Sequence, residues 1–184
     1  MRKVVWFLLL WTVAGLLTGC AISDQPLAVG DAAPDFSLED TAGITVSLDE
    51  FSNGRPVLLY LHMAVGWPSC LTQIVDLQNS QEFQSLDVPI LSIAFDSAAE
   101  MAPEGQALGI TIPLLSDSDH SVSRACNVLQ WSVGTGEPGH TFILVGADGK
   151  IAWIQYYGAP ENRGVMYVDP LEIAANVKAE LSND

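Results

Sequence analysis

The sequence has few cysteines and few basic residues, and both shortages narrow what the protein can be. Its 184 residues include 3 cysteines, too few for the disulfide framework of a small cysteine-rich secreted domain. Lysine and arginine together number 7, against 22 aspartates and glutamates, which gives a formal net charge of −15. A chain this acidic repels nucleic acid and anionic lipid headgroups. We therefore expect no nucleic-acid partner.

The N-terminal apolar run is too short to span a membrane as a helix. It covers residues 4–17, follows Arg2 and Lys3, and leads into the letters LTGC at residues 17–20. A basic start followed by a short apolar run is typical of a secretory signal peptide. The LTGC ending resembles the lipobox of bacterial lipoproteins. In that family the signal is cut before the cysteine, which then carries the acyl chains.

This resemblance divides the chain into three parts. Residues 1–19 are predicted to be a lipoprotein signal peptide, residues 20–31 a lipidated Cys20 with a tether, and residues 32–184 the folded domain. Several acyl chains on one residue hold a protein stably on a bilayer. We therefore expect the protein in the bacterial cell envelope, anchored to a membrane on its extracytoplasmic side. The alternative is an ordinary secretory signal with an incidental cysteine.

Hydrophobic periodicity predicts strands that alternate with helices. Residues 56–63 form a continuous apolar run, which indicates a central strand covered on both faces. Asp169 and Pro170 are favourable as the cap and first residue of a C-terminal helix. The order of elements predicts an α/β thioredoxin-like fold, in which helices flank both faces of a central mixed sheet. The other expected strands are 36–38, 44–48, 88–95, 110–115, 141–145 and 151–157, and the helices are 68–86, 97–108, 119–129 and 169–181.

Four blocks of sequence resemble the alkyl hydroperoxide reductase and thiol-specific antioxidant family, also called the redoxin or peroxiredoxin-like family. The first is AVGDAAPDFSLED at residues 28–40. The others follow in the family's order: RPVLLYLHMAVGWPSC at 55–70, PLLSDSDHSVSRACNV at 113–128 and TFILVGADGKI at 141–151. The resemblance implies a thioredoxin-like fold and thiol-dependent redox chemistry.

The resemblance places the reactive cysteine at Cys70, in a loop that Trp67, Pro68 and Ser69 complete. Three other key positions depart from the family pattern. Trp67 stands where the family has threonine or cysteine, Met63 where it has proline, and Gly139 where it has arginine or a cis-proline. The lost threonine and arginine would orient a peroxide and stabilise the departing oxygen.

The position of Cys70 supports two interpretations. Pro68 suits the first position of a helix, so Cys70 falls at the third, where the helix dipole predicts a lowered thiol pKa and a nucleophilic sulfur. Alternatively, Cys70 shares a helix face with Ile74 and Leu77 and is a small buried hydrophobic residue. Cys126 has core spacing with Val122, which favours packing over the alternative role of a resolving cysteine.

Two histidines are predicted near the site, where either could stabilise a thiolate. His62 ends the central strand, and His140 lies on the loop that faces the site in this fold. A metal site from both histidines and Cys70 has no supporting ligand spacing, so we expect no metal and no cofactor. Arg55, Arg124 and Arg163 are candidates to replace the missing arginine, although surface positions fit them as well.

Two functions remain open from the sequence. The first is a membrane-anchored thiol oxidoreductase or antioxidant, with a one-cysteine peroxide-reducing site at Cys70. Its partners would be a peroxide or a protein thiol or disulfide, an electron donor that the sequence does not identify, and the lipid bilayer. The alternative is a non-catalytic lipoprotein that uses the fold as a binding or assembly module.

Overall fold

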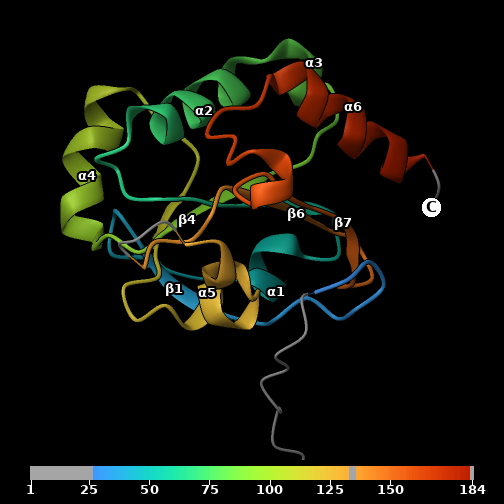
Figure 1. The fold of residues 1–184 in the computed structure, drawn as a ribbon, viewed down its shortest axis with the longest axis horizontal. Helices are drawn as coiled ribbons and strands as arrows, with labels where there is room; N and C mark the ends of the chain where they lie inside the picture. Colours follow the sequence, from blue (N-terminus) through green and yellow to red (C-terminus); the bar gives the residue numbers. More distant parts are fainter. Residues whose placement is uncertain (1–26, 133–135, 183–184) are drawn as a thin grey trace, which may run out of the picture.

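The protein forms a seven-stranded mixed sheet between two layers of helices (Figure 1). The computed structural model describes residues 27–132 and 136–182. The predicted signal peptide and Cys20 lie outside the described residues. Among the helices described, none combines the length and the apolar character that crossing a membrane requires. The predicted α/β architecture is confirmed.

The sheet has the strand order β2-β1-β5-β4-β3-β6-β7. β3 pairs in parallel with β4, and β4 with β5, whereas the pairs β1–β2, β1–β5, β3–β6 and β6–β7 are antiparallel. β3 therefore lies inside the sheet, and all five of its residues are buried, as the apolar run predicts. The strands are β1 Ser37–Asp40, β2 Thr45–Ser47, β3 Val57–Leu61, β4 Ile90–Ala94, β5 Leu114–Ser116, β6 Thr141–Val145 and β7 Ile151–Tyr156.

Alternate residues of β3 enter two separate cores. Leu58 and Tyr60 join the core under one helical layer, while Leu59 and Leu61 join the core on the opposite face. The first layer contains α2 Pro68–Asn79, α3 Gln81–Gln84, α4 Ala98–Ala107 and α6 Pro170–Leu181, and the second contains α1 Leu48–Ser52 and α5 Ser121–Ala125. The two layers lie above and below the sheet in Figure 1.

Local chemistry changes the predicted bounds of several elements. The helix expected over 68–86 is interrupted at Ser80, which ends α2 and caps α3 by accepting a hydrogen bond from the Phe83 N–H. α4 continues through Pro103, although a proline inside a helix usually kinks or breaks it. The helix expected over 119–129 is shorter, since Asn127 adopts a left-handed conformation before a 3₁₀ turn, Val128–Trp131. A second 3₁₀ turn, Pro160–Asn162, follows β7.

The segment assigned to a tether begins to pack before residue 32. The Gly30 N–H donates to the Ile151 carbonyl, and the Ile151 N–H donates to the Asp31 carbonyl. Leu27 packs against the second core. The ordered domain therefore includes residues 27–31, which lie beside the edge strand β7.

Gly158 allows two backbone segments to meet beside the loop that carries His140. Its N–H donates to the His140 carbonyl, and a Cβ at residue 158 would lie 2.6 Å from the His140 nitrogen and 2.8 Å from the Gly139 Cα. Both neighbours are backbone atoms, so neither can rotate away.

We expect Gly158→Ala to lower the free energy of unfolding by about 1–3 kcal/mol, the usual effect of overpacking. Gly66→Ala is the matched control, because nothing lies within 4 Å of a Cβ at residue 66. Urea unfolding followed by tryptophan fluorescence measures both variants. Equal stabilities would show that residues 139 and 158 do not constrain each other.

Candidate functional site around Cys70

Cys70 lies in the first turn of α2, after the loop that leaves the carboxyl end of β3. Trp67 caps α2 without a side-chain hydrogen bond, and Pro68 takes the first helical position as predicted. The Cys70 N–H donates to the Trp67 carbonyl at 3.0 Å, so it is not available to an anion. The side chain of Cys70 is 0% exposed.

Two hydrogen-bond donors act to lower the pKa of the Cys70 thiol. One is the hydroxyl of Tyr60, which points from β3 toward the first helical layer, and the other is the backbone N–H of Met63. Both hydrogen bonds favour the thiolate. Since Met63 stands where the family has a proline, its N–H is a donor that a proline would lack.

Burial outweighs these donors and raises the pKa of the Cys70 thiol to about 11. Glu137 and Asp96 raise this pKa further, because their negative charges oppose a thiolate. The lowered pKa expected from the helix start is therefore wrong. A helix dipole stabilises a charge most strongly when the free N–H groups of the helix reach that charge. Burial of the sulfur destabilises the thiolate regardless of its position on the helix, because the charge loses contact with water.

Both predicted histidines lie near the site, but each has a structural partner. His62 Nδ1 is 2.6 Å from the Met63 carbonyl oxygen, and its Nε2 is 2.8 Å from Ser92 Oγ. Burial lowers the pKa of His62 to about 4, so the ring is neutral at pH 7 and its Nδ1 proton goes to the carbonyl. His140, whose pKa burial lowers to about 3, lies with Nε2 2.9 Å from the Tyr60 hydroxyl. The histidines thus order Met63 and Tyr60, which contact the sulfur.

Trp67 stands at the start of α2 and reaches the loop before β6. The residue is 44% exposed, and its indole Nε1 donates to Glu137 Oε2 at 3.0 Å. Glu137, on the loop before β6, is buried. This hydrogen bond joins the loop before Cys70 to the loop that carries Gly139 and His140. We call the Trp67–Glu137 hydrogen bond the latch.

Cys126 lies on the opposite side of the sheet from α2. It packs in the second core with Val122 and Val128, and burial raises the pKa of its thiol to about 12. Both cysteines are free thiols. A disulfide between Cys70 and Cys126 would have to cross the sheet, so Cys126 cannot resolve an oxidised Cys70 in this conformation.

Tyr60, Asp96 and Glu137 are the contributors to the site that sequence reasoning missed. Tyr60 carries a signal in the sequence, because it puts a hydroxyl in the middle of an apolar strand, and a buried hydroxyl needs a partner. Asp96 and Glu137 are 26 and 67 positions from Cys70 along the chain. Only the sheet brings them near it.

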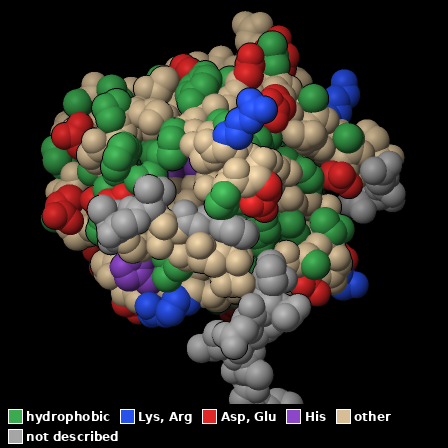
Figure 2. All heavy atoms as spheres, in the orientation of Figure 1, with side chains coloured by type: hydrophobic (Ala, Val, Ile, Leu, Met, Phe, Trp, Pro, Cys, Tyr) green, Lys and Arg blue, Asp and Glu red, His purple; other side chains and the backbone are tan. Residues whose placement is uncertain are grey.

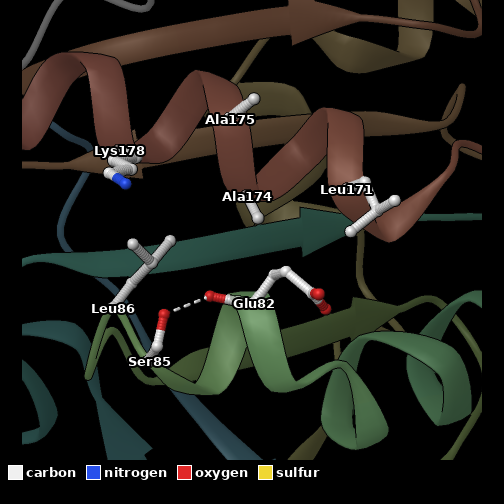
Figure 3. Close-up of a pocket in the computed structure, with 7 residues that line it drawn as sticks. All are labelled: Glu82, Ser85, Leu86, Leu171, Ala174, Ala175 and Lys178. Atoms are coloured by element: carbon white, nitrogen blue, oxygen red, sulfur yellow. Dashed lines mark hydrogen bonds between the residues drawn. The ribbon is translucent and has the colours of Figure 1, made fainter.

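A surface groove away from Cys70 lies between α3 and α6 (Figure 3). It has a volume of about 230 Å³ and is bordered by Glu82 and Lys178. Figure 3 shows Leu86, Leu171 and Ala174 along its floor and walls. Within residues 27–132 and 136–182, no group of three or more histidines, cysteines or carboxylates could hold a metal ion.

We expect Tyr60→Phe to slow the alkylation of Cys70 at pH 8 by about tenfold, because a hydrogen bond to a charged group contributes roughly 1.5–3 kcal/mol. Tyr156→Phe is the matched control, since the Tyr156 hydroxyl donates to the Leu27 carbonyl instead. Mass spectrometry of the Cys70 peptide measures the rate as a function of pH. An unchanged pH profile in Tyr60→Phe would mean that the hydroxyl does not act on the thiolate.

Comparison with known proteins finds peroxiredoxins among the relatives of this chain. Peroxiredoxin Bcp of Escherichia coli is 34% identical over 138 residues, which cover 69% of this chain and 84% of the relative. Peroxidoxin BcpB of Mycobacterium tuberculosis has a similar structure, with a TM-score of 0.70, 22% identity, and coverage of 83% of this chain and 97% of the other.

A yeast mitochondrial 1-Cys peroxiredoxin, described with a thiol resolving mechanism through glutathione and thioredoxin systems, has a TM-score of 0.71 and 16% identity. The similarity covers 83% of this chain and 76% of that one. Residues 29–154 match the AhpC/TSA family itself. With most of its length matched, the chain belongs to the AhpC/TSA family of peroxiredoxins.

Proposed function

We propose that the protein is a membrane-anchored, extracytoplasmic one-cysteine thiol peroxidase whose nucleophile is Cys70. Membership of the AhpC/TSA family supports a thiol peroxidase or antioxidant role. The observation that carries the residue assignment is the position of Cys70 in the first turn of a helix that follows the central strand β3, where the Tyr60 hydroxyl and the Met63 N–H also favour its thiolate. Donors in these positions stabilise a thiolate.

The reaction begins when Cys70 loses its proton and its sulfur attacks the terminal oxygen of a hydroperoxide. The S–O bond forms as the O–O bond breaks, and the alkoxide that leaves takes up a proton to become an alcohol. Cys70 is then a sulfenic acid, oxidised by two electrons. Tyr60 and Met63 hold the thiolate before attack, in the absence of the threonine and arginine of the family pattern.

Reduction of the sulfenic acid requires thiols from outside the chain, because Cys126 lies across the sheet. One external thiol forms a mixed disulfide with Cys70 and releases water. A second thiol attacks the sulfur of the first, which frees Cys70 and yields the external disulfide. The similar yeast protein, described with resolution through glutathione and thioredoxin systems, supports an external donor for this chain.

The latch limits the rate of this chemistry. Cys70 is 0% exposed, so a peroxide reaches it after Trp67 and its hydrogen bond to Glu137 have moved aside. A thiol with a pKa of about 11 is a thiolate about one time in ten thousand at pH 7. Both effects make this site slower than one with an exposed, acidic cysteine.

A second function, that of a non-catalytic binding or assembly module, has one observation in its favour. Cys70 is buried and the pKa of its thiol is raised, as expected of a cysteine that only packs in the core. On this alternative, Trp67 is a surface contact for a partner, and Cys70 reacts after unfolding.

We expect hydrogen peroxide to convert Cys70 of the folded chain to a sulfenic acid, trapped with dimedone, at a rate that rises about tenfold per pH unit between pH 7 and 9. The rise follows from the raised thiol pKa, since the thiolate fraction grows until the pH passes that value. Peroxide consumption with an added dithiol should be lost in Cys70→Ser and retained in Cys126→Ala. Trapping that requires a denaturant would instead favour the binding module.

The anchor has a separate test, because it does not depend on the chemistry of Cys70. We expect metabolic labelling with palmitate to mark the wild-type chain in a bacterial host and to leave Cys20→Ala unmarked. The reason is the basic start, the short apolar run and the LTGC sequence at residues 17–20. Equal labelling of both chains would remove lipidation at Cys20 from the proposal.

A further inference from the structure

Two carboxylates hold the loop in front of Cys70. Asp96 Oδ2 accepts a hydrogen bond from the Val65 N–H at 3.0 Å, and Glu137 Oε2 accepts one from Trp67 Nε1 at 3.0 Å. Val65 and Trp67 both belong to the short segment between β3 and Cys70. The two acidic side chains are therefore hydrogen-bonded to the segment that leads from β3 to Cys70.

The sheet places these carboxylates on either side of the site. β4 is parallel to β3 and ends at Ala94, two residues before Asp96. β6 is antiparallel to β3 and begins at Thr141, shortly after Glu137. The carboxyl ends of β3 and β4 and the amino end of β6 thus share one edge of the sheet. Glu137 and Asp96 face the cysteine from the two neighbours of its own strand.

No basic side chain in the described part of the chain offsets these two charges at the sulfur. The charged groups that act on the Cys70 thiol are Glu137 and Asp96. His62 and His140 are buried and neutral at pH 7. On the face in Figure 2, lysine and arginine side chains are scattered singly among more numerous acidic ones. The basic residues within the described ranges are all exposed: Arg55, Arg124, Lys150, Arg163 and Lys178.

We propose that Asp96 and Glu137 make Cys70 select uncharged hydroperoxides and reject those with a negative charge near the reacting oxygen. This inference rests on the proposed function and names the substrate class of the same site. An anionic peroxide would bring a fourth negative charge beside two carboxylates and a thiolate. Electrostatic repulsion between like charges is strongest where the surroundings exclude water, as they do around a buried sulfur.

Alkylating agents that differ in charge test this selectivity without turnover. The full chain is mixed with equal concentrations of neutral iodoacetamide and anionic iodoacetate, and mass spectrometry of the Cys70 peptide gives the ratio of the two adducts. 2-Mercaptoethanol in the same mixture is the uncharged reference thiol. We expect the iodoacetate fraction at Cys70 to be about tenfold below the reference at low salt and to recover as added salt screens the carboxylates.

The ratio of the two adducts reports the effect of the reagent's charge and not how easily Cys70 is reached, because opening of the Trp67 latch admits both reagents alike. Glu137→Gln and Asp96→Asn each remove a charge and keep an acceptor for the observed hydrogen bond, so each should raise the iodoacetate fraction severalfold. Glu82→Gln, an exposed position on α3, removes the same charge from the chain as a whole and should leave the ratio unchanged. If all three variants match the wild type, or if Glu82→Gln shifts the ratio as much as the others, the local carboxylates do not select.

Peroxides supply the second comparison. A short-chain hydroperoxy acid, whose carboxylate lies within a few bonds of the hydroperoxide, and its methyl ester share the reacting group and differ in one nearby charge. We expect the ester to oxidise Cys70 faster, with the difference reduced in Glu137→Gln. Equal rates for acid and ester, together with active turnover, would overturn the selectivity and leave the proposed peroxidase intact. Failure of every reagent to reach Cys70 in the folded chain would overturn the proposed function itself, and the inference with it.

Discussion

The pairing of β3 with its two neighbours is the constraint on which the site depends. β4 is parallel to β3 and β6 is antiparallel to it, so three segments that are distant in sequence meet at one edge of the sheet. Cys70 follows β3, Asp96 follows β4, and Glu137 and His140 precede β6. The tight approach of Gly158 to residues 139 and 140 holds the last of these segments in place. A change of register in these strands would separate the sulfur from the groups that set its chemistry.

At the sulfur, opposite electrostatic effects compete and burial is the largest. The Tyr60 hydroxyl and the Met63 N–H favour the thiolate, whereas loss of contact with water and two nearby carboxylates oppose it. The raised pKa of Cys70 follows from this balance, in which burial dominates. Contact with water would remove the largest of the unfavourable effects, while the two donors would still favour the thiolate.

Three positions that are predicted to depart from the family pattern can be placed in the structure. The Met63 N–H favours the Cys70 thiolate. The Trp67 indole donates to Glu137. Gly139 carries no charge, and the charged groups that act on the Cys70 thiol are Glu137 and Asp96.

The sequence by itself determined the α/β class, the central buried strand, the C-terminal helix capped by Asp169, and the position of Cys70 at a helix start, because each follows from local periodicity or capping. The end of the central strand predicted that His62 lies near the cysteine, whereas the prediction for His140 depended on the expected fold. The protonation of Cys70 was decided by tertiary structure, since desolvation depends on everything packed around the sulfur. Tertiary structure also decided that the sheet separates Cys126 from Cys70 and that Asp96 and Glu137 lie near Cys70. Both depend on the order of the strands, which controls which distant residues share an edge and which no local pattern specifies.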